Sequence, residues 1–323
     1  MGTGRRGRSA SRCAKVVEGL ALLLGARFLQ FAAAAALFGA ACFTSTAAPG
    51  RDNRTVRSYA FCAALTLLFG TLAWLIGETA QLSEDPAHAI DTAQLWLIAS
   101  GTRFGRICLL RMALELLCLL AFACIARPRT RWRVLTAISA LVLMSFAWTG
   151  HGSMDGGLTG AAHLGADLAH LLTAGLWLGA LPPLAMLVMR ARRSKTAADA
   201  LAAQQGLERF SSIGVAVVVV LASSGIVNSW FLVGPRHATQ LLATPYGIAL
   251  SVKLGLFCIM LVVATINRYQ LSPALQLALG EERAPAAALD RLHASLWVEM
   301  GLAVLILAAV SVLGNLTPPM ATE

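Results

Sequence analysis

Charged residues are scarce in this chain. Lys, Arg, Asp and Glu make up 13% of its 323 residues, whereas hydrophobic residues make up 57%. Soluble globular domains carry about 25% charged residues. The shortage of charge therefore excludes a soluble domain of this length and indicates a protein that crosses a membrane several times.

Several motifs are also missing. The sequence contains no nucleotide-binding motif, which argues against a pump driven by ATP, and we expect no enzyme activity. It shows no internal repeat, and its seven cysteines include no C-x-x-C pair. Six cysteines lie within or beside apolar runs, so we interpret them as small buried hydrophobic residues: Cys42, Cys62, Cys108, Cys118, Cys124 and Cys258.

Long apolar runs dominate the sequence, and a spanning helix needs about 20 such residues. We predict an all-α polytopic bundle with a basic tail at 1–19, an eight-helix membrane domain at 20–314 and a C-terminal tail at 315–323. The first apolar run is interpreted as a retained helix. Residues 87–100 are too short and polar to cross, so we expect an amphipathic surface helix there, and residues 268–292 are expected to be a surface connector. The predicted spans are 20–43, 59–80, 104–126, 133–149, 163–189, 210–232, 247–267 and 293–314.

The basic residues predict the orientation. Lys and Arg outnumber Asp and Glu by 26 to 16, an excess that in a soluble protein would suggest nucleic acid. Here it falls mostly in short segments between apolar runs, so we expect membrane lipid and no nucleic acid as a partner. Segments 51–57, 127–133 and 190–195 share one side, which the positive-inside rule makes cytoplasmic. Both termini then face outward, although the basic tail 1–19 conflicts with that placement.

Titratable residues gather at the outer end of the fifth span. His163, Asp167 and His170 are spaced i, i+4, i+7 and therefore lie on one face of a helix. His151 follows the fourth span at the same level, with Met154 beside it and Met144 deeper in that span. Imidazole binds copper in either oxidation state and thioether selects Cu(I), so the pattern predicts a copper entry site.

Other interpretations of this row stay open. Asp167 and His170 would also suit a structural hydrogen-bonded pair, or Asp167 would orient His170 without binding metal itself. A b-type haem carrier is an alternative function, but it needs histidines on opposed helices. A membrane assembly factor that uses no metal is another.

Several stretches resemble the CopD/PcoD family of copper-resistance membrane proteins. They are "GHGSMDGG" followed by "HLGADLAHLLTAGLWLGALPPL", then "ERFSSIGVAVVVVLASSGIVNSW", "TPYGIALSVKLGLFCIMLVVATINR", "LWVEMG" and "NLTPP". The resemblance implies a multi-pass protein of the bacterial inner membrane that takes up or handles copper from the periplasm. The sequence holds no fused copper-binding domain of the CopC kind, so we expect copper, as Cu(I) or Cu(II), to arrive free or on a separate carrier.

Further polar residues lie inside the apolar runs. Arg111 and Glu115 are i, i+4 and are predicted to neutralise each other as an ion pair. Lys253 is predicted to neutralise Asp167. Glu299 is assigned either to an exit path or to a pair with a basic residue. The remaining intramembrane charges are Glu78 and Arg27, and the polar residues at helix ends, which either hydrogen-bond the site or anchor helices, are Asn228 and Tyr246.

Overall fold

A computed structural model describes residues 3–46, 53–82, 91–149, 157–281 and 284–322. All regular secondary structure in these ranges is helical, which confirms the predicted all-α class. Short 3-10 helices cover Phe146–Thr149, Ala238–Ala243 and Pro319–Thr322, and a π-helix covers Asn267–Leu271. The α-helices are α1 (Thr3–Thr46), α2 (Arg54–Leu82), α3 (Thr92–Gly101), α4 (Arg103–Cys124), α5 (Pro128–Ser145), α6 (Gly157–Ser194), α7 (Ala197–Leu232), α8 (Gly234–His237), α9 (Pro245–Ile266), α10 (Ser272–Gly280) and α11 (Ala286–Leu313).

Eight helical segments of the described chain are long and apolar enough to cross a membrane, and they match the eight predicted spans. Several extend well beyond the predicted boundaries. Helices α6 and α7 run for 38 and 36 residues, because backbone hydrogen bonding continues through polar residues outside an apolar core. The predicted connector at 268–292 is mostly helical as well, since the π-helix, α10 and the start of α11 occupy it.

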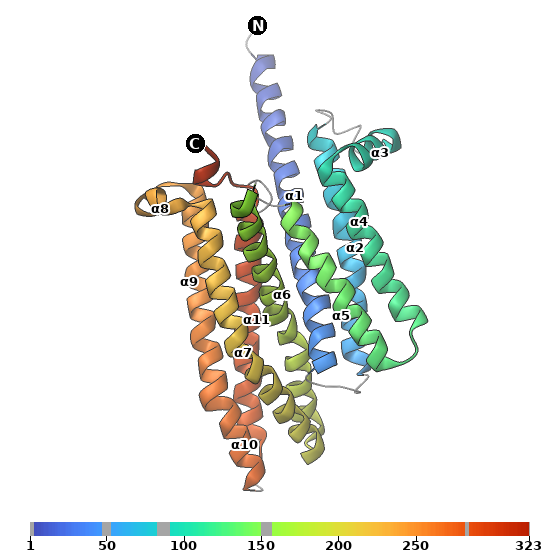
Figure 1. Ribbon diagram of the computed structural model, residues 1–323, viewed down its shortest axis with the longest axis vertical. Coiled ribbons are helices and arrows are strands. Elements are labelled where there is room, and N and C mark those ends of the chain that lie inside the picture. Colours follow the sequence, from blue (N-terminus) through green and yellow to red (C-terminus); the bar gives the residue numbers. More distant parts are fainter. Residues whose placement is uncertain (1–2, 47–52, 83–90, 150–156, 282–283, 323) are drawn as a thin grey trace.

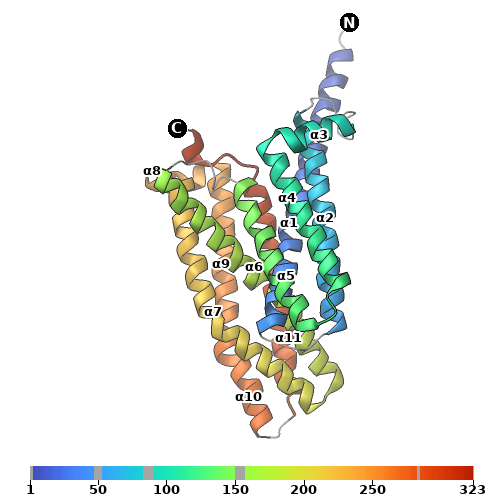
Figure 2. The ribbon, with the colours of Figure 1, turned by 45° about the vertical axis from the view of Figure 1, so that its right-hand side comes forward.

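The helices form two groups that meet at α1 and α6 (Figures 1 and 2). Helices α2 and α5 pack against α1, and α4 packs against α2 and α5. In the other group, α7 and α11 pack against α6, and α9 packs against α11. Helix α1 contacts α6 and α11 as well as its own group. It therefore joins the two groups.

The crossing of α1 and α6 depends on two glycines. A Cβ placed on Gly179 of α6 would collide with the carbonyl oxygen of Ala35, and one on Gly39 of α1 would collide with the backbone of Gly179. Small residues let helix backbones approach closely in membranes, where packing drives helix association. These glycines therefore set the distance between the two groups.

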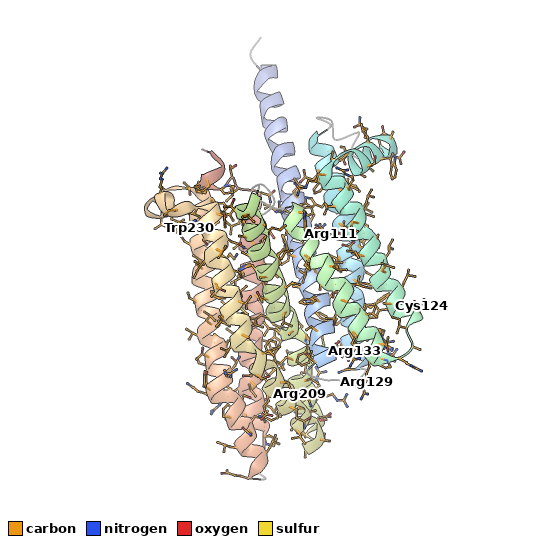
Figure 3. The ribbon with its side chains drawn as sticks, viewed as in Figure 1. Arg111, Cys124, Arg129, Arg133, Arg209 and Trp230 are labelled. Carbon is orange, nitrogen blue, oxygen red and sulfur yellow. The ribbon has the colours of Figure 1, made fainter. Side chains whose placement is uncertain are left out.

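One end of the bundle is rich in arginine, and we call it the basic end. There α1 finishes and α2, α5, α7 and α11 begin, and Figure 3 places Arg129, Arg133 and Arg209 toward it. Helix α3 lies at the opposite end (Figure 1) with Trp96 and Leu97 each 66% exposed, as expected for a helix on a membrane surface.

The expectation that the cysteines are buried is wrong for half of the six. Cys108 and Cys118 are buried and Cys42 is partly buried, but Cys62, Cys124 and Cys258 are exposed. Apolar residues face lipid as readily as protein in a membrane, so an apolar run alone does not predict the buried face.

Candidate functional site

The polar row of α6 faces a matching row of α7. Helices α6 and α7 pack against each other along their lengths. The ring of His163 stacks on Phe231 with centroids 4.6 Å apart, Asn228 Nδ2 donates to Asp167 Oδ1 at 3.4 Å, and His170 Nδ1 lies 3.2 Å from Ser224 Oγ. Because the helices are antiparallel, descending positions on α7 meet ascending positions on α6. The row therefore lies inside the bundle.

The contacts of His170 indicate its tautomer. The Ser224 hydroxyl donates its single proton to the carbonyl of Leu221 at 3.1 Å. His170 Nδ1 lies 3.2 Å from the same oxygen, and which of the two atoms donates depends on the tautomer of the ring. A neutral imidazole carries one proton, so a Ser224 hydroxyl that donates to Leu221 favours the tautomer with that proton on Nδ1 and a lone pair on Nε2. Gly225 of α7 lies beside the ring, since a Cβ there would be in ordinary contact with His170 Cε1 at 3.5 Å.

Asp167 lies within electrostatic reach of two basic groups. Its carboxylate is influenced by His163 on its own helix and by Lys253 of α9. Lys253 forms no ion pair with it at contact distance among the described residues, so the predicted neutralisation acts at longer range. The carboxamide oxygen of Asn228 is buried and has no hydrogen-bond donor. An acceptor oxygen is therefore left unsatisfied beside Asp167.

The described residues hold no ready-made metal cluster. No group of three His, Cys, Asp or Glu side chains in the described ranges is placed to ligate one ion. Residues i and i+7 are separated by about 10 Å along a helix axis, so His163 and His170 sit too far apart to share an ion directly. Asp167 with either histidine forms the closer pair.

Two of the other predicted ligands fall in a part of the chain that the structure does not describe. His151 and Met154 lie outside the described residues. Met144 is half-buried in the last turn of α5, and its neighbour Leu143 packs beside Gly175, five residues beyond His170 on α6. Tyr246 is buried in a separate apolar cluster with Val233, Leu250 and Leu313.

Sequence reasoning missed Ser224 and Phe231. Ser224 lies four residues before Asn228 within an apolar run, so its helical spacing from a residue already singled out was the available signal. Phe231 offered no such signal, because an aromatic residue at a helix end is typical of membrane proteins in general.

A second buried polar cluster surrounds Arg111 of α4, which Figure 3 labels. Its guanidinium donates to Ser145 Oγ at 2.8 Å and to Gln30 and Thr149, and it lies 3.9 Å from the ring centroid of Phe146. Glu115 instead accepts from Thr71 at 2.7 Å. Arg111 and Glu115 therefore do not form the predicted ion pair at contact distance. Hydroxyl and carbonyl groups of neighbouring helices accept from Arg111 instead.

The remaining intramembrane charges have their own partners. Arg27 donates to the carbonyl of Gly314 at 2.9 Å and interacts electrostatically with Glu78. Glu78 accepts from Trp74 Nε1 at 3.0 Å. Glu299 of α11 is 3% exposed and accepts from Asn267 Nδ2 at 2.9 Å. The predicted basic partner for Glu299 is not found among the described residues.

Comparison with known proteins identifies relatives along most of the chain. Residues 17–161 match the family described as copper resistance protein D-like, N-terminal domain, and residues 204–313 match copper resistance protein D. Copper resistance protein D of Pseudomonas syringae pv. tomato is 31% identical over 93% of this chain and 97% of its own length.

Two further relatives are more distant or shorter matches. Inner membrane protein YebZ of Escherichia coli K12 is 28% identical over 77% of this chain and 84% of its own length. Copper transport protein CutJ of Bacillus subtilis 168 is 33% identical over 39% of this chain and 22% of its own length. No solved structure matches the chain.

Proposed function

The chain belongs to the copper resistance protein D family, and we propose that it accepts copper from outside the bacterial inner membrane and passes it inward. The proposed entry is the α6 row at the end of the bundle opposite the basic end. Its place there puts the imidazoles of His163 and His170 and the carboxylate of Asp167 within reach of the periplasm.

The observation that carries this proposal is the contact of His170 Nδ1 with Ser224 Oγ at 3.2 Å. A histidine that ligates a metal usually donates its other ring N–H to a neighbouring group, which fixes the ring and the tautomer. Ser224 and the Leu221 carbonyl provide that arrangement here. His170 Nε2 is therefore held as a potential ligand, and Asp167 either joins it, three residues earlier on α6, or balances the charge of the ion.

The unsatisfied carboxamide oxygen of Asn228 supports the proposal that a cation binds beside it. A buried acceptor without a donor costs about 1–3 kcal/mol, and this oxygen lies beside the carboxylate of Asp167. Further ligands are proposed to come from His151, Met154 and Met144. The donor set of imidazole and thioether suits Cu(I), and imidazole with carboxylate suits Cu(II).

The proposed orientation follows the positive-inside rule. The basic end faces the cytoplasm, and both termini face the periplasm. The relative named an inner membrane protein supports an inner-membrane location. Copper is proposed to reach the row as a free ion or on a separate periplasmic carrier of the CopC kind, and the handling of copper serves copper homeostasis or resistance without an enzymatic step.

The alternative functions fit the structure less well. A b-type haem needs two histidines on opposed helices. Among the described side chains, His163 and His170 share α6, and His293 lies near the start of α11, toward the basic end. A metal-free assembly role gives no purpose to the contact between His170 and Ser224.

Copper accumulation in cells tests the proposal. Cells that express the wild-type chain are expected to accumulate more copper than cells with an empty vector, and His170→Ala should remove the difference. His293→Ala is the control, because that imidazole bonds Arg192 and Trp297 near the basic end. Equal accumulation by wild type and His170→Ala at equal expression would overturn the proposal.

A further inference from the structure

Glu299 differs from the other intramembrane carboxylates in one respect. A basic side chain acts electrostatically on each of the other three: Arg27 on Glu78, Arg111 on Glu115 and Lys253 on Asp167. Among the described residues no charged group acts on Glu299, and its partner there is the neutral carboxamide of Asn267. Glu299 is also 3% exposed.

Several charged residues on the neighbouring elements have partners other than Glu299. Helix α11 packs against α1, α6, α9, α10 and the π-helix. Arg268 of the π-helix donates to Ser211 of α7, and α10 carries no charged residue. Lys253 lies 14 residues from Asn267, about 21 Å along α9. Three further arginines also have partners: Arg27 contacts the carbonyl of Gly314, Arg190 contacts Asp199, and Arg192 contacts Asp290 and His293.

The hydrogen bonds of Asn267 show what is missing. Its Nδ2 donates to Glu299 Oε1, while its Oδ1 is buried and has no donor. A carboxylate has no proton to offer this oxygen, but a carboxylic acid has one. A protonated Glu299 would pair with the carboxamide through two hydrogen bonds, and both costs, the unpaired buried charge and the orphaned acceptor, would disappear.

The backbone marks the same position. Asn267 begins the π-helix that links α9 to α10, and such turns occur often at functional sites. Asn267 follows the 22 residues of α9. It therefore lies about 33 Å along that helix from the end of the bundle where the α6 row is found. The pair therefore lies toward the basic end, inside the bundle.

We propose that Glu299 and Asn267 form a proton-binding site, in which the carboxyl of Glu299 carries the proton and donates it to the carboxamide oxygen of Asn267. The site offers only oxygen atoms, which suit a proton and not the copper that imidazole and thioether bind. The coupling rests on the proposed function: the site exchanges a proton with the cytoplasm as copper moves inward through the same group of helices.

Infrared spectroscopy of the whole protein in nanodiscs tests the site itself. Glu299→Gln mimics the protonated form, because its amide retains an acceptor for Asn267 Nδ2 and a donor for Oδ1, so the fold should persist. The wild type at neutral pH should show the carbonyl band of a protonated carboxylic acid, and Glu299→Gln should lose it. Asp290→Asn on the same helix should retain it, since Asp290 is exposed and paired with Arg192. An unchanged band in Glu299→Gln would overturn the proposal.

Copper uptake into vesicles that contain a pH-sensitive dye tests the coupling. In the wild type, copper entry should change the internal pH. Glu299→Gln should bind copper with wild-type affinity but lose that pH change. An identical pH change in both proteins would overturn the coupling. A wild type that moves no copper would instead overturn the proposed function, and the infrared result would still decide whether Glu299 holds a proton.

Discussion

Ser224 illustrates how one residue outside the predicted set determines what a predicted residue can do. Its hydroxyl oxygen lies 3.2 Å from Nδ1 of His170, and a proton that this contact holds on Nδ1 leaves Nε2 for a ligand. The sequence predicted His170 from its place in an apolar run. The orienting contact depends on how α7 packs against α6, which helical spacing on one helix alone does not reveal.

At the scale of this residue, we predict that Ser224→Ala weakens copper binding without abolishing it. Loss of a group that orients a metal-ligating histidine typically costs about 10–100-fold in affinity. Ser223→Ala is the matched control, because the Ser223 hydroxyl is exposed and bonds only the backbone of its own helix. Copper titration of both variants measures the effect, and equal affinities would refute the role of Ser224.

Lys253 and Asp167 lead to a second prediction at this scale. Removing one member of a buried charge pair costs about 3–5 kcal/mol, because the other charge stays buried. Lys253→Met should therefore lower thermal stability more than Lys253→Met combined with Asp167→Asn. Unfolding measured in detergent for both proteins checks this, and a double variant less stable than the single one would show that the two charges act independently.

At the scale of elements, the eight spans could be predicted because long apolar runs are a direct signal. The surface helix near 92–101 could be predicted because its segment is too short and polar to cross. The lengths of the helices could not be predicted, since α6 and α7 continue past their apolar cores through polar residues. The close crossing of α1 and α6 was also hidden, because Gly39 and Gly179 resemble other glycines of the sequence until the two backbones are seen together.

We predict that Gly179→Ala separates α1 from α6 and lowers thermal stability by about 1–3 kcal/mol, the usual range for an overpacked position. Gly165→Ala is the control on the same helix, since a Cβ there meets no atom within 4 Å. Replacing a glycine inside a helix by alanine is otherwise stabilising by about 0.5–1 kcal/mol. Similar melting temperatures for both variants would refute the role of the crossing.

At the scale of the whole molecule, α1 joins a group built around Arg111 to a group that carries both the polar row of α6 and Glu299. The sequence located the charges of both groups. It did not reveal their partners, because hydroxyl and carboxamide groups such as Thr71 and Asn267 replace the expected ions. Spacing along one helix predicted the Arg111 and Glu115 pair, but contacts between helices decide such pairs.

The orientation of the whole molecule can be checked by labelling. A membrane-impermeant thiol reagent should label Leu158→Cys in cells with a permeable outer membrane and an intact inner membrane, since residue 158 is 91% exposed at the end opposite the basic end. Ser194→Cys at the basic end should be protected from the reagent. Labelling of the wild type measures the contribution of the native cysteines. Labelling of Ser194→Cys with protection of Leu158→Cys would reverse the orientation.

Equilibrium copper titration of the purified protein in nanodiscs tests the central claim most directly. It should be run with Cu(I) under reducing, oxygen-free conditions and with Cu(II) in air, on wild type, His170→Ala and His293→Ala. We predict that wild type and His293→Ala bind copper with the same affinity, and that His170→Ala loses this binding for the oxidation state the site accepts. Binding by His170→Ala that equals wild type in both states would contradict the account and leave the α6 row as a purely structural contact with α7.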